Sequence, residues 1–170
     1  MAAAAASGLY CRSMFEVLVF VYENYWRGDA CPELQQLGRK LSAHGFEPEE
    51  IQQALVWLDG LNFAAQHVQQ VPAPASSEQS HHSLRVYSVA EQDHLGAQCL
   101  GFVSFLESAG VLPPALREIV MDRAMAVPGG PVSVDDLKII VLMVYWSMGH
   151  EPDALVLDEL CDDSSGRLAH

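Results

Sequence analysis

The segment from Leu137 to Trp146 is apolar almost all the way round a helix, and this limits how the rest of the chain can fold. Lys138 is its one charged residue, and Ser133 and Asp136 are placed to cap and start the helix. The run is much shorter than the roughly 18 apolar residues that cross a bilayer. Because a helix that is apolar on every side must be covered by other helices, the segment predicts the middle of a helical bundle.

Other segments carry helical periodicity together with start or stop signals. Pro48 and Glu50 open one helix, and Ser88 and Glu91 have the spacing of a capping box at the start of another. Apolar residues then recur every three or four positions, as on the buried face of a helix. In addition to the apolar segment, the pattern predicts six helices, at Met14–Trp26, Pro32–Gly45, Pro48–Gly60, Ser88–Ala109, Pro113–Val127 and Pro152–Cys161.

The predicted fold is an all-α helical bundle with a winged-helix-like N-terminal helix-turn-helix unit. Leu84–Tyr87 alternates in polarity and predicts a short strand, and with it one short β hairpin. Composition changes divide the chain into a disordered extension, a three-helix unit, a flexible linker, a strand plus four-helix unit, and a disordered acidic tail. These cover residues 1–13, 14–65, 66–83, 84–161 and 162–170.

The charge balance disfavours two classes of partner. The chain has 22 acidic residues against nine Lys and Arg, a net charge of −13. Binding to nucleic-acid phosphates or to an anionic membrane needs basic residues. Four scattered cysteines with no CxxC motif are typical of a reducing compartment. We therefore expect a cytoplasmic protein.

The sequence shows no constellation of residues that predicts catalysis or a metal centre. His94 and Cys99 are five residues apart, which separates them by more than a right angle around a helix, and His81 and His82 fall in the expected linker. Acidic pairs at helix starts are explained by the helix dipole. The prediction is a protein that is not an enzyme, with no catalytic residues, no cofactor and no metal site.

Several segments together resemble one known family. They are MFEVLVFVYENY at Met14–Tyr25, GFEPEEIQQALVWL at Gly45–Leu58, LRVYSVAE at Leu84–Glu91, GFVSFLE at Gly101–Glu107 and DDLKIIVLMVYW at Asp135–Trp146. In these segments and their spacing the chain resembles the bacterial Smg family of small uncharacterised proteins. The resemblance implies a bacterial cytosolic protein and implies no activity, since none is established for the family.

DNA or RNA binding through the winged-helix-like unit is the alternative function. In such a unit the second helix of the helix-turn-helix enters the major groove, and glutamine reads adenine there. The corresponding helix here, Pro48–Gly60, has no Lys or Arg, and Arg85 is among the few positive charges near it. Phosphate repulsion should therefore oppose binding, and nucleic acid is not the expected partner.

The expected function is that of a partner-binding or regulatory protein, because the chain is acidic, shows no catalytic constellation and repeats a helix-turn-helix pattern at Pro32–Gly60 and Pro114–Gly149. Several side chains that combine apolar or adaptable character with predicted exposure are candidates for the interaction surface. Phe20 falls in a polar stripe, and Met121 and Met125 lie one turn apart beside the core face. The partner is expected to be an unknown protein, either basic or part of a ribonucleoprotein, since the end of the chain from Glu151 to Asp163 has six acids and no base. The candidate interaction residues are Phe20, Gln52, Gln53, Val56, Arg85, Met121 and Met125.

Overall fold

The structure, a computed structural model, describes residues 6–25, 33–70 and 85–150. These residues form six helices and no strand, so the all-α prediction is confirmed for the part of the chain that the structure describes. No described helix combines the length and the hydropathy needed to span a membrane. The helices are α1 (Ala6–Tyr25), α2 (Leu34–Ala43), α3 (Pro48–Gln70), α4 (Val89–Ser108), α5 (Pro114–Met125) and α6 (Val134–Ser147).

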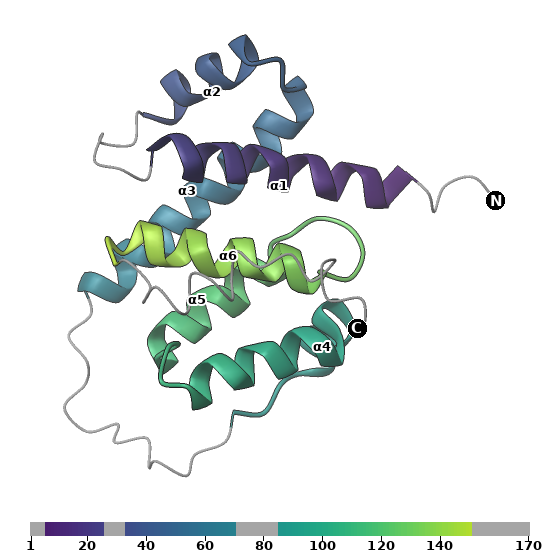
Figure 1. The fold of residues 1–170 in the computed structure, drawn as a ribbon, viewed down its shortest axis with the longest axis vertical. Coiled ribbons are helices and arrows are strands. Elements are labelled where there is room, and N and C mark those ends of the chain that lie inside the picture. The colour runs from purple at the N-terminus through teal and green to yellow at the C-terminus, as the bar shows by residue number, and fades with distance from the viewer. Residues whose placement is uncertain (1–5, 26–32, 71–84, 151–170) are drawn as a thin grey trace, which may run out of the picture.

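Two helices, α3 and α6, hold the bundle together. The helix α2 lies at one end and α4 at the other, with α1, α6 and α5 between them (Figure 1). The long helix α3 crosses this stack and contacts α1, α2, α5 and α6, while α6 contacts α1, α3, α4 and α5. One continuous apolar core therefore runs through the helices of both predicted units.

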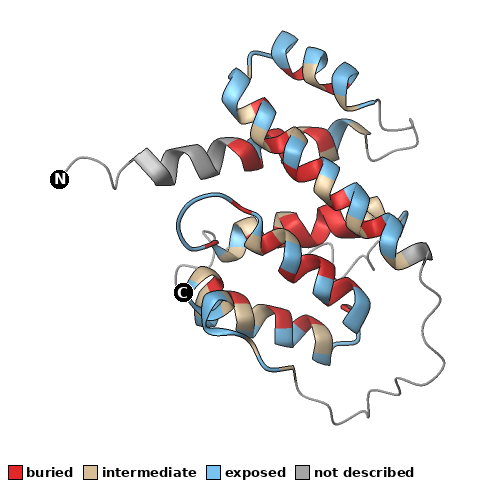
Figure 2. Ribbon diagram, turned by 180° about the vertical axis from the view of Figure 1, so that it is seen from behind, coloured by how far each residue is buried: buried red, intermediate tan, exposed pale blue. Residues whose placement is uncertain are grey.

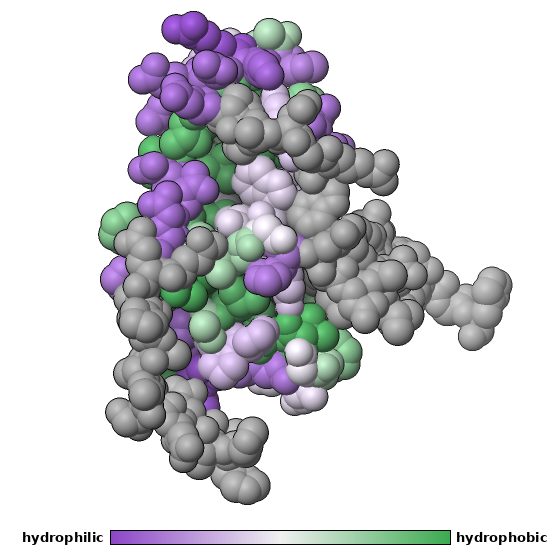
Figure 3. All heavy atoms as spheres, turned by 90° about the vertical axis from the view of Figure 1, so that its left-hand side faces the viewer, coloured by the Kyte–Doolittle hydropathy of each residue, from purple (hydrophilic) through white to green (hydrophobic). Residues whose placement is uncertain are grey.

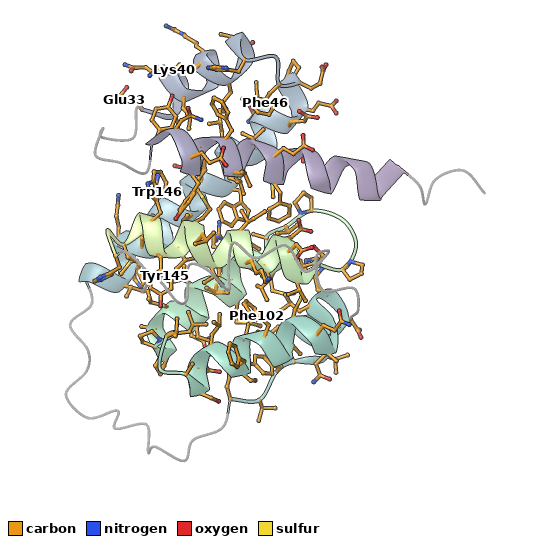
Figure 4. All side chains as sticks on the ribbon, viewed as in Figure 1. Glu33, Lys40, Phe46, Phe102, Tyr145 and Trp146 are labelled. Atoms are coloured by element: carbon orange, nitrogen blue, oxygen red, sulfur yellow. The ribbon has the colours of Figure 1, made fainter. Side chains whose placement is uncertain are left out.

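The central position predicted for the apolar segment is confirmed in α6. Leu137, Ile140 and Val141 are fully buried, and Ser133 Oγ accepts a hydrogen bond from the amide of Asp136 at 3.1 Å. Tyr145 and Trp146 point to opposite sides of the helix, Trp146 towards α1 (Figure 4). The Tyr145 hydroxyl donates to the carbonyl of Val111, just beyond α4. Helices on both sides thus cover α6.

Two helices are longer than the sequence pattern predicted. Helix α3 does not end at Gly60 but continues to Gln70, because Leu61 and Ala65 extend its buried stripe. Residues 66–70, which were predicted to belong to a linker, are therefore helical. Helix α1 begins at Ala6, within the predicted extension.

The predicted strand is not formed by the residues of it that the structure describes, and the hairpin is not confirmed. Arg85, Val86 and Tyr87 form a coil that leads into α4, and the Arg85 side chain is bonded to Glu91 and Glu118. The winged-helix-like unit therefore has no wing strand in the described segment. Residues 71–84, the predicted helix Pro152–Cys161 and the acidic tail lie outside the described residues.

Candidate functional site

The outward face of α3 carries an exposed stripe that runs along most of the helix. Seen from behind, exposed and buried residues alternate along α3 (Figure 2). Two large apolar side chains lie on the exposed side, with Val56 62% exposed and Phe63 74% exposed. They are seven residues apart, two turns of the helix, and therefore face the same way. The exposed stripe consists of Gln52, Val56, Asp59, Phe63 and His67.

A groove runs beside this stripe, between α3 and α5. It consists of two adjoining hollows of about 550 and 600 Å³ that share Asp59, Gly60 and Arg123. Val56 lines the first hollow and Phe63 the second. We call the two hollows together the α3–α5 groove. Its walls therefore include both of the exposed apolar residues of α3.

The floor of the groove is fixed by a reciprocal pair of hydrogen bonds. The indole Nε1 of Trp57 donates to the carbonyl of Arg123 at 3.0 Å, and Arg123 Nη1 donates back to the carbonyl of Trp57 at 3.3 Å. A β carbon on Gly60 would lie 2.0 Å from Arg123 Nη1. Glycine at this position is thus what lets the arginine lie across α3.

The charges at the groove are mainly negative. The guanidinium of Arg123 is held by the neighbouring Asp122 at 2.7 Å, so its positive charge is already compensated. Burial raises the pKa of Glu118, but hydrogen bonds from Arg85 and Arg117 outweigh it and hold this pKa below its usual range. Asp59 forms no ion pair with any residue that the structure describes. Its carboxylate is the uncompensated charge of the groove.

One polar atom in the groove wall lacks a partner. Gln53 lines the hollow beside Val56, and its side-chain Oε1 is buried without a hydrogen bond to any described residue. A buried acceptor without a donor costs free energy, and this oxygen is closed to solvent. Of the candidate residues predicted from sequence, Gln52, Gln53 and Val56 are brought together here.

Two other candidate residues are held by neighbouring side chains. Phe20 is half-buried, with ring centroids 4.6 Å from His44 and 5.5 Å from Phe46, so it is not the exposed aromatic that was predicted. The contact forms because α1 packs beside the turn between α2 and α3. Arg85 is bonded to Glu91 and Glu118 and lies over the Tyr87 ring, which leaves its charge occupied.

The methionine pair on α5 is not exposed as predicted. Met121 is only 2% exposed and belongs to the core, and Met125 is partly buried. The core that α5 forms with α3, α4 and α6 includes Met121. Phe63 was missed because it lies beyond the predicted end of its helix. The predicted helix ended at Gly60, and a continued 3.6-residue period would have placed Phe63 on the same side as Val56.

The residues weighed as metal ligands bond to the main chain instead. His94 Nε2 lies 3.2 Å from the carbonyl of Ala124, and the Cys99 thiol donates to the carbonyl of Val132 at 3.2 Å. Burial raises the pKa of Cys99 to about 11, which keeps it a thiol. His81 and His82 lie outside the described residues.

Positive charge is exposed at the far end of the bundle, on α2. Arg39 and Lys40 are exposed there, and the Lys40 ammonium lies 5.3 Å from the centroid of the Tyr25 ring (Figure 4). This end of the molecule is hydrophilic over the face shown in Figure 3, and the apolar surface gathers further down. Arg39 and Lys40 therefore lie on a different helix from the exposed stripe of α3.

Comparison with known proteins gives one consistent family. Residues 14–170 match the model of a family described as "Protein of unknown function (DUF494)". Proteins described as "Protein Smg homolog" from Methylibium petroleiphilum and Leptothrix cholodnii are each 64% identical, and the one from Bordetella avium is 50% identical. Each match covers 92% of this chain and 100% of the relative. No solved structure matches.

Proposed function

The chain belongs to the Smg family, whose function is not established, and we propose that it is a non-enzymatic partner-binding or regulatory protein of the bacterial cytosol. The observation that carries this proposal is the α3–α5 groove with Val56 and Phe63 exposed along it. Leaving both side chains in water forgoes the free energy that burial would give. A partner that covers them recovers it.

The surroundings of the two apolar residues support a docking role. Interface hot spots are apolar or aromatic anchors in a well-packed centre with polar groups at the rim. Phe63 lies over a hollow whose rim holds Asp59 and Asp122, and Val56 has Gln52 beside it. The groove floor is rigid because Trp57 and Arg123 hold α3 and α5 together. A partner would meet a surface that is largely formed in advance, which lowers the entropic cost of binding.

DNA or RNA binding through a winged-helix-like unit of α1–α3 is the alternative, supported by Arg39 and Lys40 on α2. The helix that would read bases, α3, carries acids and has no Lys or Arg between Pro48 and Gln70. Phosphates would therefore be repelled by the reading helix. Fluorescence anisotropy with labelled DNA and RNA at low salt tests this alternative, and the absence of binding would exclude it.

Recovery of tagged protein from gently lysed cells, with and without nuclease, tests the proposed function. We expect a co-purifying protein that survives nuclease. The Val56→Ser/Phe63→Ser double variant should lose this protein, because it removes the apolar contacts without adding charge. Phe105→Ser is the matched control, since Phe105 is 55% exposed on α4. Unchanged recovery with the double variant, or loss of the partner on nuclease treatment, would contradict the proposal.

A further inference from the structure

The chemistry of the α3–α5 groove narrows the kind of partner that it fits. We propose that the groove binds a basic amphipathic helix of a partner protein, whose apolar side chains contact Val56 and Phe63 and whose Lys or Arg side chains face Asp59. This inference rests on the proposed function, because it names the partner for the same surface. It goes further by fixing the partner's secondary structure and the sign of its charge.

The spacing of the apolar residues fits a helix lying along α3. Val56 and Phe63 are separated by two turns, about 10.5 Å along the axis. A partner helix aligned with α3 presents apolar side chains at the same interval when they are seven residues apart. Binding of an amphipathic helix in an apolar groove is a common recognition mode.

An extended peptide fits this surface less well than a helix does. Extended peptides gain affinity by adding a strand to the free edge of a sheet. The walls of the groove are the helices α3 and α5, whose backbone groups are already bonded within each helix. A helix satisfies its own backbone groups, so it can cover Val56 and Phe63 without bonding to the backbone of the groove.

The charge of the groove favours a basic partner. Asp59 has no ion pair among the described residues, and no Lys or Arg occurs on α3 to compensate it. The other carboxylates at the rim, Glu118 and Asp122, are already paired with arginines of the chain. A cation on the partner that reached Asp59 would complete the charge pattern. Such complementarity gives specificity and a faster association rate.

The donors of the partner's side chains must match the acceptor that the groove offers. The carboxylate of Asp59 lines the hollow that also includes Val56 and Gln53. Lys and Arg are donors with no acceptor, so either could bond to the carboxylate of Asp59. An acidic partner offers no donor from its ionised side chains and would be repelled by Asp59.

The test uses two synthetic peptides of about 18 residues, or five helical turns. Both have the same leucine face, and the polar face is Lys in one and Glu in the other. Calorimetry should show that the Lys peptide binds at least about tenfold more tightly than the Glu peptide. Amide chemical shifts should change along α3 and α5. Val56→Ser/Phe63→Ser should abolish binding of the Lys peptide, with circular dichroism confirming that the fold is kept.

A matched pair of charge variants separates the groove from general attraction to an acidic protein. Asp59→Asn should reduce the preference for the Lys peptide severalfold. Glu23→Gln, at an exposed acid on α1, should leave it unchanged. Equal effects of the two variants, or equal affinity for the two peptides, would overturn the inference. If the inference failed in this way but Val56→Ser/Phe63→Ser still lost the cellular partner, the proposed function would stand without the inference. If this double variant kept the cellular partner, the proposed function would fail instead.

Discussion

Helices α3 and α4 are similar in length, with 23 and 20 residues, and each has a glycine near its middle. The two glycines serve different needs. Gly60 leaves α3 unbroken and provides the space in which Arg123 lies. Gly96 has φ 70° and ψ 169°, a conformation that interrupts α4 and that glycine almost alone adopts. Gly60 is required because Arg123 of α5 occupies the space of a β carbon, and Gly96 is required by its own backbone conformation.

The outward faces of α3 and α4 also differ. Each has an exposed phenylalanine, Phe63 on α3 and Phe105 on α4. Each ring lies 6.4 Å from another ring on its own helix, Phe105 from Phe102 and Phe63 from His67. Phe63 in addition lines a hollow formed with a second helix. Exposure of an aromatic residue alone therefore does not indicate an interaction site. The α3–α5 groove beside Phe63 is the stronger evidence.

Replacing Gly96 with alanine should have the largest effect on stability. Gly96 has a positive φ of 70°, and a β carbon in this backbone conformation costs on the order of 1–3 kcal/mol. Urea denaturation should show the unfolding free energy of Gly96→Ala lowered by this amount. Gly101→Ala is the control on the same helix, because its β carbon meets nothing within 4 Å, and it should be neutral or stabilising. Equal effects of the two substitutions would show that the bend at Gly96 is not maintained in solution.

Replacing Phe63 with serine should separate binding from folding. We expect the affinity for the captured partner to fall at least about tenfold, or about 1.4 kcal/mol, because an apolar anchor is lost. The unfolding free energy should change by less than about 0.5 kcal/mol, as is usual for surface substitutions. Titration of the purified partner and urea denaturation measure the two quantities. A comparable loss of affinity in Phe105→Ser would end the distinction between the two faces.

Replacing Glu91 with glutamine tests the capping box at the start of α4. Hydrogen bonds from Arg85, and then from the Ser88 amide, lower the pKa of Glu91 from 4.5 to about 2. A lowered pKa in the folded state stabilises the protein above pH 4.5, and this stability is lost as the pH falls towards 2. At pH 7 we expect Glu91→Gln to lose about 1 kcal/mol, a typical value for a helix cap.

The prediction for Glu91 is checked by the pH dependence of the unfolding free energy. The difference in unfolding free energy between the wild type and Glu91→Gln should shrink between pH 4.5 and pH 2, as followed by urea denaturation at each pH. A difference that stayed constant over this range would contradict the ion pair with Arg85. Asp93→Asn, at an exposed acid on the same helix, should change the unfolding free energy at pH 7 by less than about 0.5 kcal/mol.

Replacing Gly60 with alanine should have the smallest net effect, because two contributions oppose each other. Alanine favours a helix over glycine by roughly 0.5–1 kcal/mol, and displacing Arg123 loses a hydrogen bond of about the same value. In an Arg123→Ala background the clash is absent, so Gly60→Ala should then stabilise by roughly 0.5–1 kcal/mol. A double-mutant cycle measures this coupling, and additivity of the two substitutions would show that they do not interact.

Local signals predicted much of the fold correctly. The capping box of Ser88 and Glu91 forms as expected, and so does the cap of Ser133 on α6. The buried face predicted for α5, including Leu116 and Ile119, is buried. Part of the site was also predictable, since Val56 and the two glutamines were candidates from the sequence and all three line the groove. Its other half was not, because Phe63 follows a glycine that normally signals a helix end.

The amino-acid sequence determined where most helices begin and which stripe of each is apolar, because caps and periodicity depend on residues three or four positions apart. The tertiary structure decided which apolar residues remain outside. It buried Met121 against neighbouring helices, left Val56 exposed, and extended α3 past Gly60. The bonds between Trp57 and Arg123 join residues 66 positions apart, and the groove exists only where their two helices meet. Such contacts leave no periodic trace in the chain, since each partner is selected by the packing of the whole bundle.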